Sequence, residues 1–288
     1  MVHFESKEKD ICVICIHGMC GTIIDNYPLY AEASNEYGLS IAGLEFKGNA
    51  KYFKAKKGCL NLGSFELIPY ILATCKDTKD FLELSKTLNI LDIDFSSKVI
   101  KSSLHWMIAD KKECYVMEST KEGLKIYKNP YGVLTNNPKF PFHLDNIKLY
   151  LNLTKEVVES KLSSNLESFS LGSGSYGLPG DFTSSSRFVR AFYTLSNSEP
   201  SLDENTNVSQ FFHILDSVSC PKGSVLTKDK KDHYTIYSSC INVNKGIYYF
   251  KRYTNSRIQS VSLYKADYKG DKLLTYSINE KEDIAHLN

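Results

Sequence analysis

The short connections between strand-like runs are the feature that most constrains the fold of this 288-residue chain. Runs rich in β-branched and aromatic residues are separated by brief polar segments such as 110–112 and 244–246. A parallel pair of strands needs a crossover of about a dozen residues or more, so connections this brief make antiparallel hairpins. Strands are predicted over 11–16, 39–46, 104–109, 114–118, 124–127, 234–243, 247–253 and 258–264.

Helical patterns lie between the two groups of strands, over 65–75, 78–88, 184–195 and 210–218. Ser64 and Asp77 are the expected N-caps of the first two, and Pro69 should shorten or bend the first. The Ser- and Gly-rich stretch 163–183 is predicted to be a long loop. Strands at both ends with helices between them indicate an α+β architecture, with helices layered on antiparallel sheets in a single domain over 1–288.

The charges of the chain nearly cancel, with 35 Lys and Arg against 33 Asp and Glu, or a net +2. This leaves no basic field that would hold a phosphate backbone, so nucleic acid is not an expected partner. The longest apolar run, 11–24, is interrupted by His17 and two glycines and is shorter than the roughly 20 residues of a membrane span. No secretory signal pattern precedes it. The sequence predicts a cytoplasmic protein with no membrane partner.

One group of residues has the spacing of a metal-binding motif but lacks the structural context that such a motif needs. Cys12, Cys15, His17 and Cys20 could form a zinc ligand set, but 12–16 is an apolar strand pattern in which Cys serves as a small hydrophobe. The side chains of Cys12 and Cys15 would also point to opposite faces of such a strand. The eight cysteines of a chain this long are expected to be free thiols. No metal site is predicted.

Three further patterns are expected to be structural. Residues 172–177 match the dinucleotide-binding spacing of glycines, but no buried strand precedes them and no helix starts at their end, so no cofactor is predicted. His105 and His143 are single histidines in apolar surroundings, which is typical of core histidines with a hydrogen-bond partner.

Two segments carry groups suited to catalysis. Residues 131–138 have the pattern of a buried strand that ends in Asn136, whose NH₂ could donate to a developing oxyanion or simply form a turn. Arg187 follows a turn over 177–186 that leads into a capped helix. Only four of the 35 basic residues are Arg, and none precedes position 187. Either a planar guanidinium fork is required there, or Arg187 is an ordinary surface arginine.

Taken in order, several segments resemble the choloylglycine hydrolase family, which contains bile salt hydrolases and penicillin V acylases, and the match is closer to the bile salt hydrolases. The segments are 26–30, 35–44, 104–107, 132–136, 177–188 and 211–215, and the resemblance runs from about 25 to 288. It implies an N-terminal-nucleophile hydrolase fold, an αββα sandwich of antiparallel sheets. It also implies a homotetramer without a cofactor that hydrolyses the amide joining glycine or taurine to a bile acid.

The resemblance implies roles for particular residues. The family's nucleophile is a Cys exposed when the initiator Met is removed; its thiolate attacks the amide carbonyl and its own α-amine handles the proton. Asn136 matches the active-site asparagine of the family, and Arg187 matches its late active-site arginine. Glu45 stands where a second asparagine is expected, and a carboxylate there would repel a developing oxyanion.

The opening residues depart from the family pattern. The chain reads Met1-Val2-His3, with no Cys, Ser or Thr at the second position. We therefore expect a sandwich without its first strands and with little or no turnover. The alternatives are a non-catalytic bile-acid-binding remnant, or a penicillin V acylase-type amidase whose start is mis-assigned. An in-frame Met-Cys encoded upstream would restore the enzyme interpretation.

Overall fold

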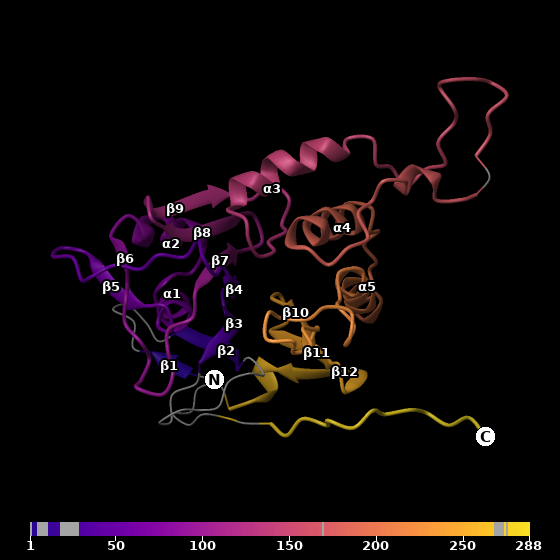
Figure 1. The fold of residues 1–288 in the computed structure, drawn as a ribbon. Helices are drawn as coiled ribbons and strands as arrows, with labels where there is room; N and C mark the ends of the chain where they lie inside the picture. Colours follow the sequence, from indigo (N-terminus) through magenta and orange to yellow (C-terminus); the bar gives the residue numbers. More distant parts are fainter. Residues whose placement is uncertain (1, 5–10, 18–28, 169, 268–273, 275) are drawn as a thin grey trace. The chain divides into compact units, whose positions relative to one another are not determined.

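The computed structural model describes residues 2–4, 11–17, 29–168, 170–267, 274 and 276–288, with the backbone alone at 2–4 and 11–17. The chain forms two compact units. The first combines Met1–Gly132 with Thr235–Asn288, and the second is Val133–Tyr234. Figure 1 shows the course of the chain through the elements of both units.

A seven-stranded sheet dominates the first unit, with the strand order β1-β2-β3-β4-β7-β8-β9. Every neighbouring pair is antiparallel, although residues 46–103 separate β4 from β7. The short connections predict the pairing of β7 with β8 and of β8 with β9. The tight turn between Thr120 and Gly123, which pair across β8 and β9, is one example. Strand β3 was not predicted. The bounds are β1 Val2–Phe4, β2 Ile11–His17, β3 Tyr30–Asn35, β4 Ser40–Glu45, β7 Leu104–Ala109, β8 Cys114–Thr120 and β9 Gly123–Lys128.

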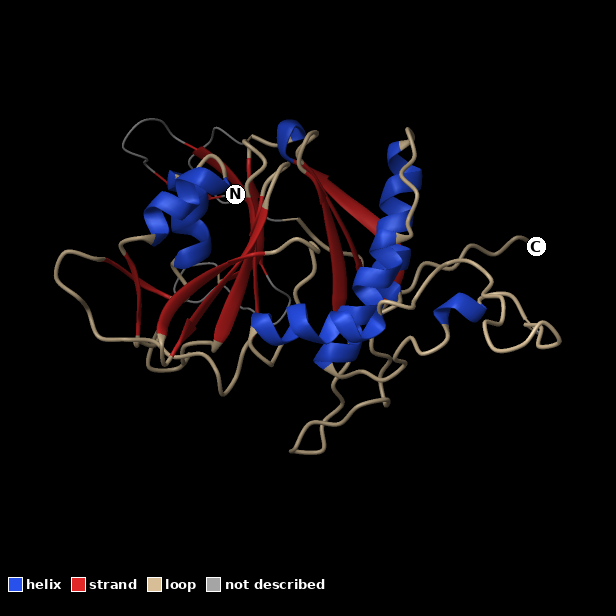
Figure 2. Ribbon diagram, turned by 90° about the horizontal axis from the view of Figure 1, so that it is seen from above, coloured by secondary structure: helices blue, strands red, loops and turns tan. Residues whose placement is uncertain are grey.

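A second antiparallel sheet in the same unit contains β10 (Tyr237–Asn242), β11 (Ile247–Arg252) and β12 (Asn255–Ser262). Glu32 of β3 connects the two sheets, because its Oε1 accepts the hydroxyl protons of Ser239 at 2.5 Å and Tyr248 at 2.7 Å. Burial, and then the charge of Glu32, raise the pKa of Tyr248. Figure 2 shows the strands of the two sheets as neighbouring layers.

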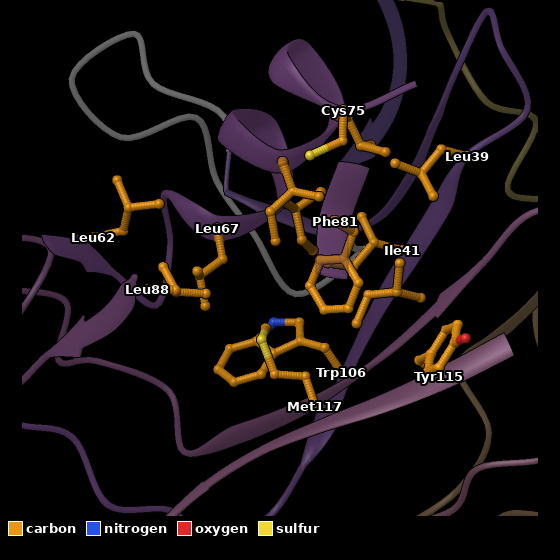
Figure 3. Close-up of a cluster of buried hydrophobic side chains, with 14 of the residues drawn as sticks. Leu39, Ile41, Leu62, Leu67, Cys75, Phe81, Leu88, Trp106, Tyr115 and Met117 are labelled. Atoms are coloured by element: carbon orange, nitrogen blue, oxygen red, sulfur yellow. The ribbon is translucent and has the colours of Figure 1, made fainter. Parts of the chain in front are cut away.

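Helices α1 (Leu67–Thr74) and α2 (Thr78–Ser85) pack with the seven-stranded sheet around one hydrophobic core. Ala33 of β3 belongs to this core although its neighbour Glu32 contacts the second sheet, because successive strand residues point to opposite faces. Figure 3 shows Trp106 and Met117 of the sheet close to the ring of Phe81 from α2. The unit therefore has a helical layer followed by two sheets.

The first helix begins later than predicted. Ser64 is not its N-cap: α1 starts at Leu67, and its capping residue, Glu66, makes no side-chain cap hydrogen bond. This start places Pro69 in the first turn, where the missing N–H of proline would have no helical partner in any case. The prediction for Asp77 is confirmed, because its side chain accepts from the backbone N–H groups of Lys79 and Asp80.

A parallel pair, β5 (Leu60–Gly63) and β6 (Leu88–Leu91), is joined through α1 and α2. The sequence predicted neither strand and extended the second helix to Leu88. Helix α2 instead ends at Ser85, and Leu88 is a buried strand residue that pairs with Leu60. A two-helix crossover supplies the length that a parallel connection needs.

The second unit is mainly helical, with α3 (Phe140–Asn146), α4 (Ser184–Ser196) and α5 (Glu204–Asp216). Helix α4 was predicted almost to its bounds, whereas α3 was missed. Helix α5 starts six residues before the predicted position 210, because Asp203 caps it by accepting from the N–H of Thr206 at 2.7 Å. None of the helices in the described ranges is long and apolar enough to cross a membrane.

The predicted strand over 131–138 is wrong. The side chain of Asn129 accepts from the backbone N–H groups of Tyr131 and Gly132 at 3.1 and 3.0 Å, which bends the chain into a turn. Gly132 also has a φ of +62°, a conformation that favours glycine. The chain then reaches Asn136 through a loop without regular secondary structure.

The loop over 163–183 contains a short 3₁₀ turn, η2 (Ser173–Ser175), and is anchored at its base. The N–H of Thr154 donates to the carbonyl of Gly174 at 3.0 Å. A Cβ on Gly174 would lie 2.2 Å from the carbonyl oxygen of Glu156. This close approach of two backbone segments requires glycine at position 174.

Three acidic residues near the C-terminus lie against the hairpin between β11 and β12; we call these residues, Glu280, Glu282 and Asp283, the acidic clasp. Glu280 pairs with Arg252 at 2.5 Å and Asp283 with Arg257 at 2.7 Å. Glu282 accepts from both the N–H and the hydroxyl of Ser256. The clasp thus holds the last strand at its first residues.

Asn35 connects β3 to the end of α1. Its Nδ2 donates to the carbonyls of Leu72 and Cys75 at 3.0 and 2.8 Å, and its Oδ1 accepts from the N–H groups of Tyr37 and Leu39 at 3.1 Å each. The side chain is buried. One amide therefore satisfies the last carbonyls of a helix and the turn between two strands.

The Asn35→Ala variant should lower the free energy of unfolding by about 3 kcal/mol, because buried partners lose their hydrogen bonds. Urea denaturation measures this change. Asn244→Ala, at an exposed turn, is the control and should change stability by less than about 0.5 kcal/mol. Equal stabilities of the two variants would contradict the role of Asn35.

Candidate active site

Helix α4 begins at Ser184 because Thr183 caps it, accepting from the N–H of Ser186. The helix carries two arginines, Arg187 and Arg190, three residues apart and therefore on one face. Both are directed back toward the turn that precedes the helix, as their hydrogen bonds show.

Arg187 and Asn136, the two residues that the sequence singled out, are joined by a hydrogen bond. Its Nη2 donates to Oδ1 of Asn136 at 2.7 Å, and its Nε donates to the carbonyl of Phe182 at 3.1 Å. Burial, and then the charge of Arg190, lower the pKa of Arg187. In the described part of the chain, no carboxylate forms an ion pair with this guanidinium. A partly buried cation without a carboxylate partner attracts an anion.

Arg190 holds the turn in place and is itself buried. Its Nη1 donates to the carbonyls of Pro179 and Asp181, both at 2.6 Å, and its Nε donates to the carbonyl of Ser217 at 2.9 Å. One guanidinium thereby ties the turn before α4 to the residue that follows α5. Sequence reasoning did not assign this residue a role, although the scarcity of arginine applied equally to it.

Asp181 stabilises the same turn. Its carboxylate accepts from the hydroxyl of Ser186 at 2.6 Å and from the N–H of Thr183 at 2.8 Å. These hydrogen bonds, from Ser186 first and then Thr183, lower the pKa of Asp181 to about 2. The ionised carboxylate is the form that the turn requires.

Asn136 is held through its backbone as well as its side chain. Its N–H donates to the hydroxyl oxygen of Ser184 at 2.8 Å, and its carbonyl oxygen lies 3.2 Å from Nε2 of His143. His143 is fully buried and its ring stacks on Phe188 at 4.9 Å. The expectation that His143 is a core histidine is confirmed.

His105 is likewise a core histidine, in the first unit. It is fully buried, stacks on Phe46 at 4.3 Å, and places Nδ1 3.2 Å from Oε1 of the equally buried Glu118. The two residues belong to the neighbouring strands β7 and β8 and take no part in the arrangement around Asn136.

Of the three residues predicted for the site, the structure brings Asn136 and Arg187 together, whereas Glu45 lies on a strand of the other unit. Glu45 is the exposed last residue of β4, in the first unit, where it pairs with Leu104 of β7. Asn136 and Arg187 both belong to the second unit, Val133–Tyr234. The proposed role of Glu45 therefore rests on the family resemblance.

The predicted thiols agree where they can be compared. No disulfide joins Cys59, Cys75, Cys114, Cys220 or Cys240, which carry thiols. No group of metal-ligating side chains occurs among the residues whose side chains are described. The set of Cys12, Cys15, His17 and Cys20 lies outside them. Residues 172–177 contain η2, with neither a strand before it nor a helix start after it, so the glycine spacing is accidental.

Acid should loosen the turn before α4. Because the folded pKa of Asp181 is lowered, its contribution to stability is complete above the unfolded value of about 4 and disappears as the pH falls from about 4 to about 2. Thermal melts across this range should therefore fall more steeply for the unaltered chain than for Asp181→Asn. Parallel curves for the two proteins would contradict this contribution.

Comparison with known proteins defines the class to which this fold and site belong, the linear amide C–N hydrolases. The model of the choloylglycine hydrolase family within that class matches residues 2–276. The family match thus begins before residue 25, where the resemblance between sequence segments was predicted to start. The chain belongs to the choloylglycine hydrolase family.

Relatives and solved structures agree with this assignment. The chain is 45% identical over 267 residues to the bile salt hydrolase/transferase of Lactiplantibacillus plantarum, covering 92% of this chain and 82% of that protein. A mutant of the conjugated bile acid hydrolase from Clostridium perfringens superposes with a TM-score of 0.88 at 36% identity, covering 99% and 88% of the two chains. Penicillin V acylase from Agrobacterium tumefaciens, at 18% identity and a TM-score of 0.66 over 83% and 68%, shares the fold.

Proposed function

We propose that this chain serves the hydrolysis of the amide bond in glycine- or taurine-conjugated bile acids. Family membership supports an amide hydrolase, and the similarity to a bile salt hydrolase/transferase supports the substrate class. The observation that carries the proposal is the hydrogen bond from Arg187 to Asn136, because these residues match the active-site pair of the family and are brought together across 51 residues of sequence.

In the proposed mechanism, Asn136 stabilises the tetrahedral intermediate. Its Oδ1 accepts from Arg187, which fixes the orientation of the amide and leaves the NH₂ as the end that donates to the developing oxyanion. A donor held in this way has little reorganisation to make when charge develops. Loss of one oxyanion donor costs roughly a hundred- to a thousandfold in rate.

Arg187 is proposed to support the nucleophile of an N-terminal-nucleophile hydrolase. The guanidinium is partly buried and has no ion-pair partner in the part of the chain that is described, so it favours a thiolate over a thiol nearby. In such a hydrolase the thiolate attacks the amide carbonyl, the amine of conjugation leaves with a proton, and water hydrolyses the acyl-enzyme.

A polypeptide produced from Met1 to Asn288 is proposed to show little or no turnover. Its second residue is Val2, which has neither a thiol nor a hydroxyl, and the mechanism needs nucleophile and α-amine on one residue. In another hydrolase, loss of the nucleophile costs about a millionfold in rate. A second candidate function, for such a polypeptide, is the binding of conjugated bile acids without cleavage.

Glu45 is proposed to weaken the site. Where the family has an oxyanion donor, this chain presents an exposed carboxylate, and like charges repel. The Glu45→Asn variant should therefore bind the anion cholate more tightly than the unaltered chain, by about threefold, since exposed charges interact weakly. Calorimetry measures this change. Equal or weaker binding by Glu45→Asn would overturn the proposed role of Glu45.

Taurocholate separates the two candidate functions. The polypeptide from Met1 to Asn288 should bind taurocholate in calorimetry and release no taurine above a blank. Arg187→Met should bind it more weakly, whereas Arg257→Met, which alters an arginine that pairs with the acidic clasp, is the matched control and should bind normally. Absence of binding would remove the binding function.

A second polypeptide tests the enzyme proposal. If the in-frame sequence upstream encodes Met-Cys, the product that starts there should release taurine from taurocholate. Failure to release it, or preferential cleavage of phenoxymethylpenicillin, would overturn bile acid hydrolysis. Release of taurine by the polypeptide from Met1, with contaminating enzyme excluded, would overturn the proposed inactivity. The homotetramer implied by the family stays a prediction.

A further inference from the structure

The backbone of Asn136 is anchored on both sides by side chains to which no catalytic step has been assigned. Ser184 accepts its N–H at 2.8 Å, and the Nε2 of His143 lies 3.2 Å from its carbonyl oxygen. These contacts are separate from the hydrogen bond of Arg187, which reaches the side-chain oxygen. Asn136 is therefore restrained at its N–H, its C=O and its amide by three different residues.

We propose that His143 and Ser184 are positioning residues that aim the NH₂ of Asn136 at the oxyanion. The inference deepens the proposed function and rests on it for the identity of the anion. Neither residue is required to touch substrate. They hold the main chain of Asn136 in place. Because Arg187 sets the orientation of the side chain, the NH₂ group is then fixed in both position and direction.

The hydrogen bond between His143 and the carbonyl of Asn136 shows that Nε2 of the imidazole is protonated. A carbonyl oxygen can only accept, so Nε2 must carry the proton that it donates to Asn136. The imidazole has little freedom to leave this geometry, because it is fully buried and lies nearly parallel to the ring of Phe188, with 18° between the planes. The hydrogen bond is thus made by a ring already fixed by packing.

The contact of Ser184 belongs to a closed set of hydrogen bonds. Its hydroxyl donates to Oγ1 of Thr135 at 2.9 Å, and the hydroxyl of Thr135 donates to the carbonyl of Ser184 at 3.0 Å. With its proton engaged on Thr135, the Ser184 oxygen offers a lone pair to the N–H of Asn136. Residues 135 and 136 are thereby joined to the first residue of α4, one turn from Arg187.

This double anchoring has a chemical purpose. A donor contributes fully to an oxyanion only when it is held at hydrogen-bond distance from the place where charge develops. Asn136 lies on an irregular loop, which by itself would not hold a side chain so closely. The contacts with α4 and with the buried His143 give that loop the rigidity of the helices.

The product anion tests the proposal without a nucleophile. In cholate, a carboxylate oxygen stands in for the oxyanion, whereas the corresponding alcohol, with a hydroxymethyl group in its place, has the same steroid and no charge. His143→Leu keeps the volume and removes the donor, so cholate should bind about tenfold more weakly and the alcohol within about twofold of normal.

Matched variants separate positioning from folding. His143→Gln, which restores a donor at a similar reach, should recover most of the cholate affinity. Ser184→Ala should weaken cholate binding about fivefold, whereas Ser185→Ala, one residue along the same helix turn, should not change it. Equal losses for cholate and the alcohol in His143→Leu would indicate a merely structural role and overturn the proposal.

A second measurement does not depend on ligand. In protein labelled with ¹⁵N-asparagine, the side-chain NH₂ signal of Asn136, identified by its loss in Asn136→Asp, should shift in His143→Leu and Ser184→Ala and stay in place in Ser185→Ala. An unchanged signal in both anchoring variants would overturn the proposal. Failure of the unaltered chain to bind either steroid, with the signals shifting as expected, would instead count against the proposed function alone.

Discussion

The hydrogen bonds of Glu32 to Ser239 and Tyr248 are the interaction on which the layered structure of the first unit depends. Strand β3 must serve two surfaces, because its alternate residues face the helical core and the second sheet. Ala33 fills the core and Glu32 reaches the buried hydroxyl of Tyr248. A half-buried carboxylate is tolerated when it accepts hydrogen bonds, and here two hydroxyl groups of the opposite sheet donate to its Oε1. The two sheets are thereby joined by a polar contact.

The second unit is organised by a different chemical group, the guanidinium. Arg190 gathers three carbonyl oxygens from two segments, while Arg187 orients Asn136. The other two arginines of the chain, Arg252 and Arg257, bind the acidic clasp. In a sequence that otherwise uses lysine, Arg187 and Arg190 each bind two or more oxygens, whereas Arg252 and Arg257 each pair with one carboxylate. This agrees with the advantage of a rigid planar fork over a flexible ammonium group.

Features with a local physical cause could be predicted from the sequence. The hairpins of β7 to β9 follow from brief polar connections, and the start of α2 follows from Asp77, whose side chain accepts two backbone protons. The pairing of Asn136 with Arg187 could be expected only through the family resemblance. No pattern in the sequence brings together residues so far apart.

The errors have causes that a single segment does not reveal. Strand β3 was missed because Glu32 and Ser34 look like loop residues until their partners, on other strands, are known. The strand predicted over 131–138 does not form, because the side chain of Asn129 accepts from two backbone N–H groups and bends the chain. His143 gave no functional signal, because its hydrogen bond is to a main-chain carbonyl, which every residue possesses.

The acidic clasp has a consequence for the free side of the three-stranded sheet. Strand β12 lies at the end of that sheet, where unpaired backbone groups would invite a strand from another molecule. Because Glu282 accepts from the backbone N–H of Ser256 and Asp283 pairs with Arg257, the clasp covers the first residues of β12 and leaves that edge less open to a second copy of the chain. The same ion pairs are exposed to solvent at their acidic members, so added salt would weaken this protection against self-association.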